Sequence, residues 1–325
     1  MRSPRSTWEM SYDADRRHRR LPGQATVTGM RFESAGHLLR RFCRAMGDLK
    51  IDDVTPEAVA EFLQGEGALS ASWMLRYRVL TGLYRFAVSR GYVGCSPLPT
   101  TLPKLPLQQT PYVYSTEELR RLLEATSVLR IGHRPQVPAM YRTLLLLLYG
   151  SGMRIGEALR LALQEVDLTE QVITVRDTKF FKTRLVPIGP KLNQELVAHV
   201  ERRRLLPLPH GEASSLFTTR DGRPWQYTRV ISWFQHVRRA ADISCPVGEP
   251  RPPRLHDIRH TAAAHRVLAW YRSGQDVQRL LPQLATYLGH IDIRATQRYL
   301  QMTPDLLQAA SQRFAQYAKG AEHEG

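Results

Sequence analysis

The chain has 325 residues, of which 46 are Lys or Arg and 30 are Asp or Glu, so it carries a formal net charge of +16. This length exceeds one typical domain and predicts two, and the excess of positive charge predicts a polyanionic partner such as nucleic acid. The longest apolar run, Leu144 to Tyr149, is far shorter than the ~20 residues that a membrane-spanning helix needs, which excludes such a helix.

The cysteines and the N-terminus indicate the compartment. Cys43, Cys95 and Cys245 are odd in number and widely spaced, unlike a disulfide framework or a cysteine zinc cluster. They predict a reducing compartment, so we expect a cytoplasmic, nucleoid-associated protein. Residues 1–24 are rich in arginine and have no apolar segment, which predicts a flexible basic arm and not a secretory signal.

A helical domain is predicted over residues 25–93. Thr55-Pro56-Glu57 supplies a capping residue and a first-turn proline for one helix, and another helix begins at Ser70. That helix carries an apolar stripe with three- or four-residue spacing, which predicts core packing and not a base-stacking surface: Trp73, Tyr77, Leu80, Tyr84 and Ala87. Residues 94–111 are rich in proline without apolar periodicity and predict an extended linker.

The second domain is predicted over residues 112–319. It opens with a capping box at Ser115, and a buried helix from Met140 to Tyr149 stops at Gly150-Ser151-Gly152. Two β-branched runs, 171–175 and 184–188, flank a polar connection and predict a β-hairpin. Further helices are predicted over 192–205, 228–241, 256–271, 277–288, 292–300 and 304–319. The predicted fold is therefore mainly α with a small antiparallel β-sheet.

One group of residues predicts phosphodiester chemistry. His256 and Arg259 are three residues apart, so on a helix both project toward one ligand. Leu288-Gly289-His290 has the form of a helix stop, which leaves His290 in the break, and Tyr299 follows nine residues later. Upstream, Arg154 adds a second guanidinium group. Because arginine pairs bidentately with phosphate oxygens and a phenol can serve as a nucleophile, this order predicts attack on a phosphodiester.

Two further residues have competing interpretations. His256 and His260 have the spacing of a metal-binding pair, but the HExxH pattern and a third ligand are missing, so no metal is predicted. His260 is interpreted as a buried, hydrogen-bonded helix residue. Glu157, three residues after Arg154 on the same helix face, is expected to support the arginines and not to transfer protons.

These residues resemble the tyrosine recombinases, the lambda-integrase and Xer-type group of DNA strand-exchange enzymes. The segment with Arg154 and Glu157 is similar to that of the first family arginine and its acidic companion. His256-Asp-Ile-Arg259-His260 is similar to the H-x-x-R-H box, and His290 and Tyr299 match the second histidine and the nucleophile. The resemblance is close over residues 112–318, and the amino-terminal helices match the core-binding domain only in outline.

The resemblance implies a role for each residue. Tyr299 attacks a DNA phosphate to form a 3′-phosphotyrosyl intermediate, while Arg154 and Arg259 stabilise the charge that develops on the phosphate oxygens. His256 assists the loss of the tyrosine proton, and His290 donates a hydrogen bond to the phosphate. The general acid is a lysine in the hairpin turn: Lys179 is chosen, with Lys182 as the alternative. No ATP, metal or other cofactor is expected.

The partners implied are double-stranded DNA and further copies of the chain, joined in a synaptic tetramer on DNA. The helix at 304–319 either packs on its own domain or docks on a neighbouring protomer. Three other functions remain open: a type IB topoisomerase-like enzyme that reseals its own strand, a DNA-binding regulator without cleavage, and a metal-dependent nuclease.

Overall fold

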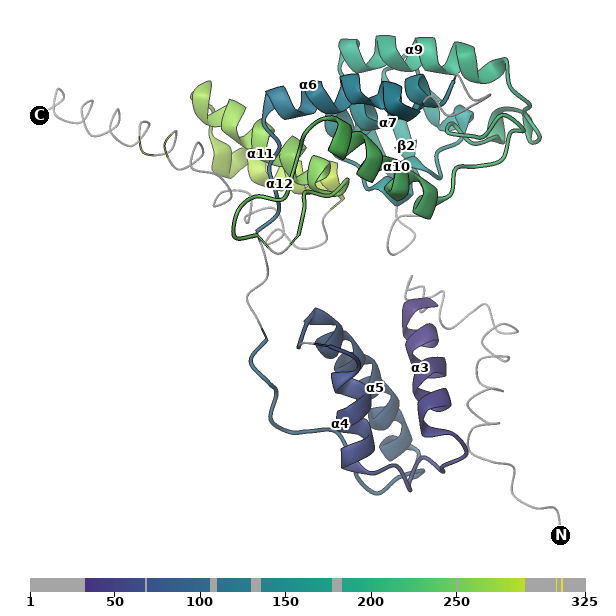
Figure 1. Ribbon diagram of the computed structural model, residues 1–325, viewed down its shortest axis with the longest axis vertical. Helices are drawn as coiled ribbons and strands as arrows, with labels where there is room; N and C mark the ends of the chain where they lie inside the picture. The colour runs from purple at the N-terminus through teal and green to yellow at the C-terminus, as the bar shows by residue number, and fades with distance from the viewer. Residues whose placement is uncertain are drawn as a thin grey trace, which may run out of the picture. The chain divides into compact units, whose positions relative to one another are not determined.

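The computed structural model describes residues 33–67, 69–105, 110–129, 136–176, 183–249 and 251–289, together with residues 308 and 311 (Figure 1). The described residues form two compact units, one up to residue 105 and one from residue 110 onward. The described part is mostly helical with a small antiparallel sheet, which confirms the predicted fold class.

The first unit is built from three described helices: α3 (Glu33–Met46), α4 (Pro56–Gln64) and α5 (Ala71–Ser89). Thr55 caps α4 through its side chain, and Ser70 is the cap residue of α5, as the sequence predicts. The predicted stripe of α5 packs into the core, where Phe42 of α3 meets Tyr84 edge to face at 6.4 Å between ring centroids. The stripe is therefore a packing surface, as predicted.

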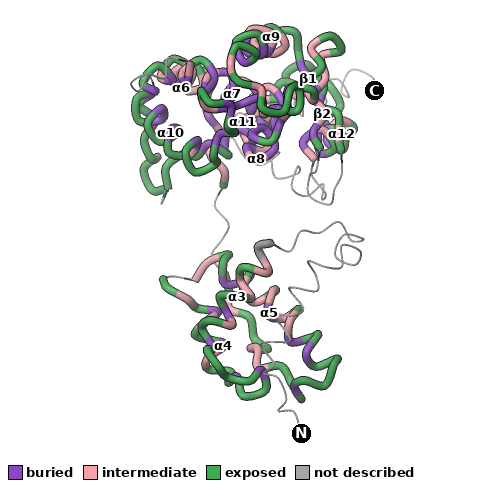
Figure 2. Tube along the Cα trace, turned by 90° about the vertical axis from the view of Figure 1, so that its right-hand side faces the viewer, coloured by how far each residue is buried: buried purple, intermediate pink, exposed green. Residues whose placement is uncertain are grey.

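The core of the second unit is built around one apolar helix, α7 (Val137–Ser151), which contributes many of the buried residues (Figure 2). The capping box at Ser115 opens α6 (Thr116–Ala125), which confirms that prediction. The remaining α-helices in the described residues are α8 (Ile155–Ala158), α9 (Pro190–Arg204), α10 (Tyr227–Ala240), α11 (Asp257–Arg272) and α12 (Val277–Leu288). No helix in the described ranges has the length and apolarity needed to cross a membrane.

The sheet has the strand order β1-β2-β3 and is antiparallel throughout. The predicted hairpin is confirmed as β2 (Val172–Val175) paired with β3 (Arg184–Pro187). The strand β1 (Val166–Asp167) is not predicted by the sequence, because a two-residue strand is too short to show alternation. The register sets Val175 opposite Arg184, so the second hairpin strand begins with an arginine.

A buried histidine makes the stability of the second unit depend on pH. His199 in α9 is fully buried, its Nε2 bonds the Leu216 carbonyl, and its Nδ1 has no partner among the described residues. Burial lowers the pKa of its imidazole to about 4, and the charges of Arg202 and Arg203 add to this effect against the carbonyl bond. The unfolded chain, with a histidine pKa of about 6.5, binds the proton more readily. The stabilisation that depends on a neutral His199 is therefore fully present above pH ~6.5 and is lost as the pH falls toward 4.

We expect His199→Gln to reduce the decrease in unfolding free energy at acid pH. In the wild type this decrease amounts to at most about 3 kcal/mol. Glutamine still offers an amide to the Leu216 carbonyl but does not titrate. The measurement is the urea unfolding free energy of both proteins between pH 7.5 and 4.5. His236→Gln in α10, an exposed position, is the matched control. Equal slopes in wild type and His199→Gln would refute the assignment.

Candidate active site

The first candidate arginine lies in the turn between α7 and α8. α7 ends at Ser151 and is capped by Gly152, whose φ of 60° is in the left-handed region that glycine adopts without steric cost. A Cβ there would lie 2.6 Å from Leu288 Cδ2, so the close approach of α12 also requires glycine. Arg154 caps α8, and its backbone N–H donates to Glu157 Oε2 over 2.9 Å. Arg154 thus precedes the helix and does not share its face, although its side chain still meets Glu157.

Glu157 is a buried carboxylate held between two arginines. Its Oε1 accepts from Arg154 Nη1 at 2.9 Å and from Arg184 Nη1 at 3.1 Å, and its Oε2 accepts from Arg184 Nη2 at 2.8 Å. Burial raises the pKa of the carboxyl, but the hydrogen bonds and charges of Arg184 and Arg154 outweigh it and lower the pKa to about 2. The carboxylate is therefore ionised at neutral pH and orients both guanidinium groups.

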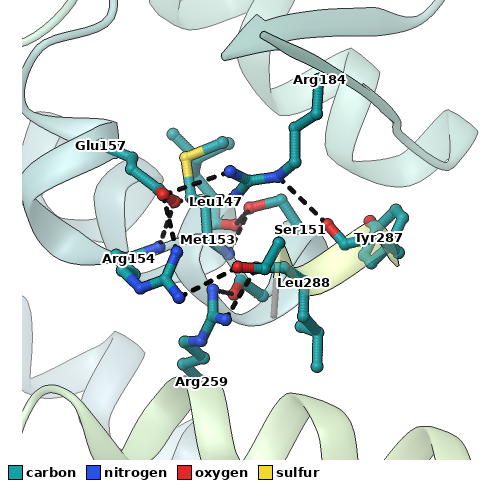
Figure 3. A network of polar contacts seen from close by, with 11 residues as sticks. Leu147, Ser151, Met153, Arg154, Glu157, Arg184, Arg259, Tyr287 and Leu288 are labelled. Carbon is teal, nitrogen blue, oxygen red and sulfur yellow. Dashed lines mark hydrogen bonds and ion pairs between the residues drawn. The ribbon is translucent and has the colours of Figure 1, made fainter. Parts of the chain in front are cut away.

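The second candidate arginine, Arg259, lies in the first turn of α11 and is only 3% exposed. Its Nη1 donates to the Gly152 carbonyl at 2.6 Å and its Nη2 to the Leu288 carbonyl at 2.7 Å. Arg154 Nη2 donates to the next carbonyl, that of Gly289, at 3.1 Å (Figure 3). The two guanidinium groups therefore converge on consecutive carbonyls at the end of α12, immediately before His290 in the sequence.

Two histidines lie at the start of α11. The rings of His256 and His260 are 5.0 Å apart between centroids and nearly perpendicular. Partial burial and, to a smaller extent, the neighbouring His256 lower the pKa of His260 to about 4. The pKa of His256 is lowered by partial desolvation and then by the charge of Arg259, against the opposing charge of Asp257. Both imidazoles are therefore neutral at pH 7, and a neutral imidazole can accept a proton.

The turn that carries His256 is fixed from two sides. The buried Asp257 accepts from the backbone N–H of Arg254 at 2.7 Å and from its Nη2 at 3.0 Å. Tyr114 donates its hydroxyl to the Arg254 carbonyl at 2.9 Å, and its backbone N–H donates to Thr261 Oγ1 at 2.9 Å. The segment that opens the second unit is therefore bound directly to the helix of the candidate site.

The structure brings together Arg154, Glu157 and Arg259, with His256 and His260 on the helix of Arg259. The other predicted site residues lie outside the described residues: Lys179 and its alternative Lys182, His290 and Tyr299. The predicted helix at 304–319 also falls outside them, except for residues 308 and 311. Among the described residues, no group of three or more His, Cys, Asp or Glu side chains could hold a metal ion.

Arg184 is the site residue that the sequence does not reveal. The pattern predicts only that it lies on the second hairpin strand, where a charged residue beside a polar connection is typical of a solvated position. In the structure its side chain is 11% exposed and reaches across to the carboxylate of Glu157. Its partner is 27 residues away in the sequence, so no local spacing indicates the pair.

Comparisons with known proteins agree with this geometry. The model of the phage integrase family matches residues 113–305. A putative integrase/recombinase y4rE of Sinorhizobium fredii is 32% identical over 88% of this chain and 90% of its own length. A second putative integrase/recombinase of Sinorhizobium fredii, y4rB, is 37% identical over 66% of this chain and 68% of its own length. The tyrosine recombinase XerD of Corynebacterium glutamicum is 30% identical over 83% of this chain and 86% of its own length.

Solved structures show the same fold. A lambda integrase tetramer bound to a Holliday junction has a TM-score of 0.63 at 16% identity, covering 89% of this chain and 76% of that chain. The integrase of the transposon Tn1549, in complex with a circular intermediate DNA, has a TM-score of 0.62 at 19% identity, covering 86% and 91%. Because the family model matches more than half of the sequence and a relative above 30% identity spans most of it, this chain belongs to the phage integrase family, the tyrosine recombinases, which are site-specific DNA strand-transferring enzymes.

Proposed function

We propose that this recombinase cleaves double-stranded DNA with Tyr299 as the nucleophile and Arg154 and Arg259 as the groups that bind the attacked phosphate. The observation that carries the proposal is the convergence of both guanidinium groups on the Leu288 and Gly289 carbonyls, the last two before His290 in the sequence. Preorganised donors of this kind stabilise the negative charge that grows on the non-bridging oxygens, and removing one typically slows a reaction about 10²–10³-fold.

Two proton transfers accompany the proposed cleavage step. A phenol with a pKa of ~10 is a weak nucleophile at neutral pH, so Tyr299 must lose its proton as its oxygen bonds to phosphorus. His256 takes that proton, and its lowered pKa keeps the imidazole neutral beforehand. The phosphorus–O5′ bond breaks, and Lys179, or Lys182 in its place, gives a proton to the leaving 5′ oxygen. His290 donates a hydrogen bond to the phosphate, while Glu157 and His260 support these groups.

Rejoining reverses the same steps. The phosphotyrosyl bond conserves the energy of the broken phosphodiester, so the 5′ hydroxyl of a second strand can displace Tyr299 without ATP. Exchange of strands requires two DNA sites held together, which we propose occurs in a tetramer joined through the helix at 304–319. The net charge of +16 and the lambda integrase tetramer on a Holliday junction support DNA as the partner and this assembly.

We also propose a role for each segment of the chain. Residues 1–24 form a basic arm, 25–93 a DNA-binding domain, 94–111 a linker and 112–319 the catalytic domain. A protein with this role works on the nucleoid in the cytoplasm. The first unit carries the exposed basic side chains Arg78, Arg85 and Arg90 on or beside α5, which fits contact with the DNA backbone.

A nicked duplex tests the chemistry. The target site is first selected from random DNA by repeated rounds of binding. The selected duplex is then nicked beside the scissile phosphate, on its 3′ side. Cleavage then releases a short fragment with a 5′ hydroxyl, which diffuses away. We expect a protein–DNA adduct that survives a denaturing gel, disappears on protease treatment and forms equally well in EDTA. The released fragment should carry the free 5′ hydroxyl, and the protein should be joined to the 3′ phosphate of the retained strand.

Other outcomes select the competing functions. Free DNA ends that vanish in EDTA indicate a metal-dependent nuclease. Binding without an adduct indicates a regulator. An adduct from a protein that relaxes supercoiled plasmids but never joins two sites indicates a topoisomerase-like enzyme. Each of these results would contradict the proposal.

A further inference from the structure

Arg184 joins three parts of the candidate site through one guanidinium group. Its Nη1 and Nη2 donate to the two oxygens of Glu157 at 3.1 and 2.8 Å. Its Nε donates to the Tyr287 carbonyl at 3.2 Å (Figure 3). The group therefore connects β3, which follows the segment with Lys179, to the carboxylate that holds Arg154 and to the last turn of α12 before His290.

The end of α12 is shaped around this side chain. Gly289 has a φ of 69°, in the left-handed region that ends many helices. A Cβ at Gly289 would lie 2.9 Å from Arg184 Nη1 and 3.1 Å from its Cζ. Because any other residue would press on the guanidinium group, the glycine both ends the helix and leaves room for Arg184. Arg184 and the C-terminal end of α12 therefore pack closely against each other.

The charges show why Arg184 matters for Arg154. The Glu157 side chain is 3% exposed, whereas the Arg154 side chain is 38% exposed. A buried carboxylate needs partners to stay ionised, and Arg184 is the larger contributor to keeping the pKa of Glu157 low. With Arg184 absent, Glu157 would have to turn further toward Arg154 or take up a proton. Either change would alter the hydrogen bond through which Glu157 orients the Arg154 guanidinium.

Arg184 acts through other residues and does not reach the phosphate itself. All three of its nitrogens, Nε included, donate to groups of the protein. We propose that Arg184 is a positioning residue: it sets the direction of Arg154 through Glu157 and holds the last turn of α12 through the Tyr287 carbonyl. This inference rests on the proposed function, because it concerns the same cleavage step.

The test measures cleavage at saturating DNA, with the nicked duplex described above. The variants are Arg184→Gln, Arg184→Lys, Glu157→Gln and the double variant Arg184→Gln with Glu157→Gln. Groups that orient the residues of a site typically change activity by about 10–100-fold, and we expect that loss in the cleavage rate of Arg184→Gln with little change in DNA affinity. Arg184→Lys keeps the charge but has one nitrogen, which cannot span Glu157 and the Tyr287 carbonyl, so it should remain several-fold slow.

A buried arginine away from the site is the matched control. Arg203 is 1% exposed and donates through Nε to the Ser215 carbonyl at 2.8 Å and through Nη1 to the Pro207 carbonyl at 3.1 Å. Arg203→Gln should lower the melting temperature yet cleave at the wild-type rate well below that temperature. The double variant separates positioning from destabilisation, because independent sites multiply their losses to within about twofold. We expect the Arg184→Gln change to cost clearly less in the Glu157→Gln background than alone.

Each outcome decides between distinct conclusions. Wild-type cleavage by the folded Arg184 variants, or losses that multiply in the double variant, would overturn the inference. An equal loss in Arg203→Gln would do the same, because the effect would then report general stability. Failure of the wild-type protein to form any adduct would reject the proposed function instead, which keeps the two failures distinguishable.

Discussion

Tyr299→Phe is expected to eliminate the covalent protein–DNA adduct while leaving DNA binding within a few-fold of wild type. The substitution removes one oxygen atom, which is the atom that bonds to phosphorus, and keeps the aromatic ring. Without it the arginines can still bind the phosphate, but no group completes the displacement. A denaturing gel with the nicked duplex measures the adduct, and a native gel measures affinity.

Tyr271→Phe is the matched control, since Tyr271 lies near the end of α11 and takes no part in the proposed chemistry. Its adduct yield should equal that of wild type. A Tyr299→Phe protein that still forms an adduct would show that another side chain is the nucleophile. Peptide mapping of that adduct would identify it.

The elements that the sequence predicts correctly are those set by neighbouring residues. Thr55 and Ser115 accept hydrogen bonds from backbone N–H groups three residues ahead, so their helices begin where the local pattern says. Gly289 ends α12 in the left-handed conformation, as the Leu288-Gly289-His290 pattern predicts. The α5 stripe is buried because its spacing matches the helical period. Each of these signals is complete within a few residues.

The parts that escape prediction depend on distant partners. Strand β1 pairs with β2 across a turn, with Val166 opposite Ile173. A strand of two residues is too short to show the alternation that would predict it. The sequence indicates a solvated strand position for Arg184, whereas in the structure its side chain forms an ion pair with the buried Glu157. Glu157 was expected to support Arg154 and Arg259, yet the described contacts pair it with Arg154 and Arg184. A motif identifies which residues take part but not which of them touch, because the contacts depend on how α7, β3 and α12 pack.

Arg154→Ala and Arg259→Ala are expected to lose similar amounts of cleavage but very different amounts of stability. Each removes a guanidinium group proposed to bind the phosphate, so the cleavage rate at saturating DNA should fall about 10²–10³-fold in both. Arg259 is 3% exposed and satisfies two carbonyls, those of Gly152 and Leu288. Its loss leaves buried acceptors unpaired at about 1–3 kcal/mol each.

The Arg154 side chain is 38% exposed, and after its removal Glu157 keeps both hydrogen bonds from Arg184 and the one from the backbone N–H of residue 154. A partly exposed ion pair contributes about 0–1 kcal/mol, so urea unfolding of Arg154→Ala should stay close to wild type. Both rates are measured well below the lower melting temperature, with Arg142→Ala as the control for loss of an arginine ion pair between helices. Equal destabilisation by the two substitutions would contradict the buried arrangement of Arg259, whereas full cleavage by Arg154→Ala would remove it from the phosphate site. The contrast follows from one physical difference: Arg259 holds α7 to α12 from within the core, and Arg154 meets the same segment from the solvent side.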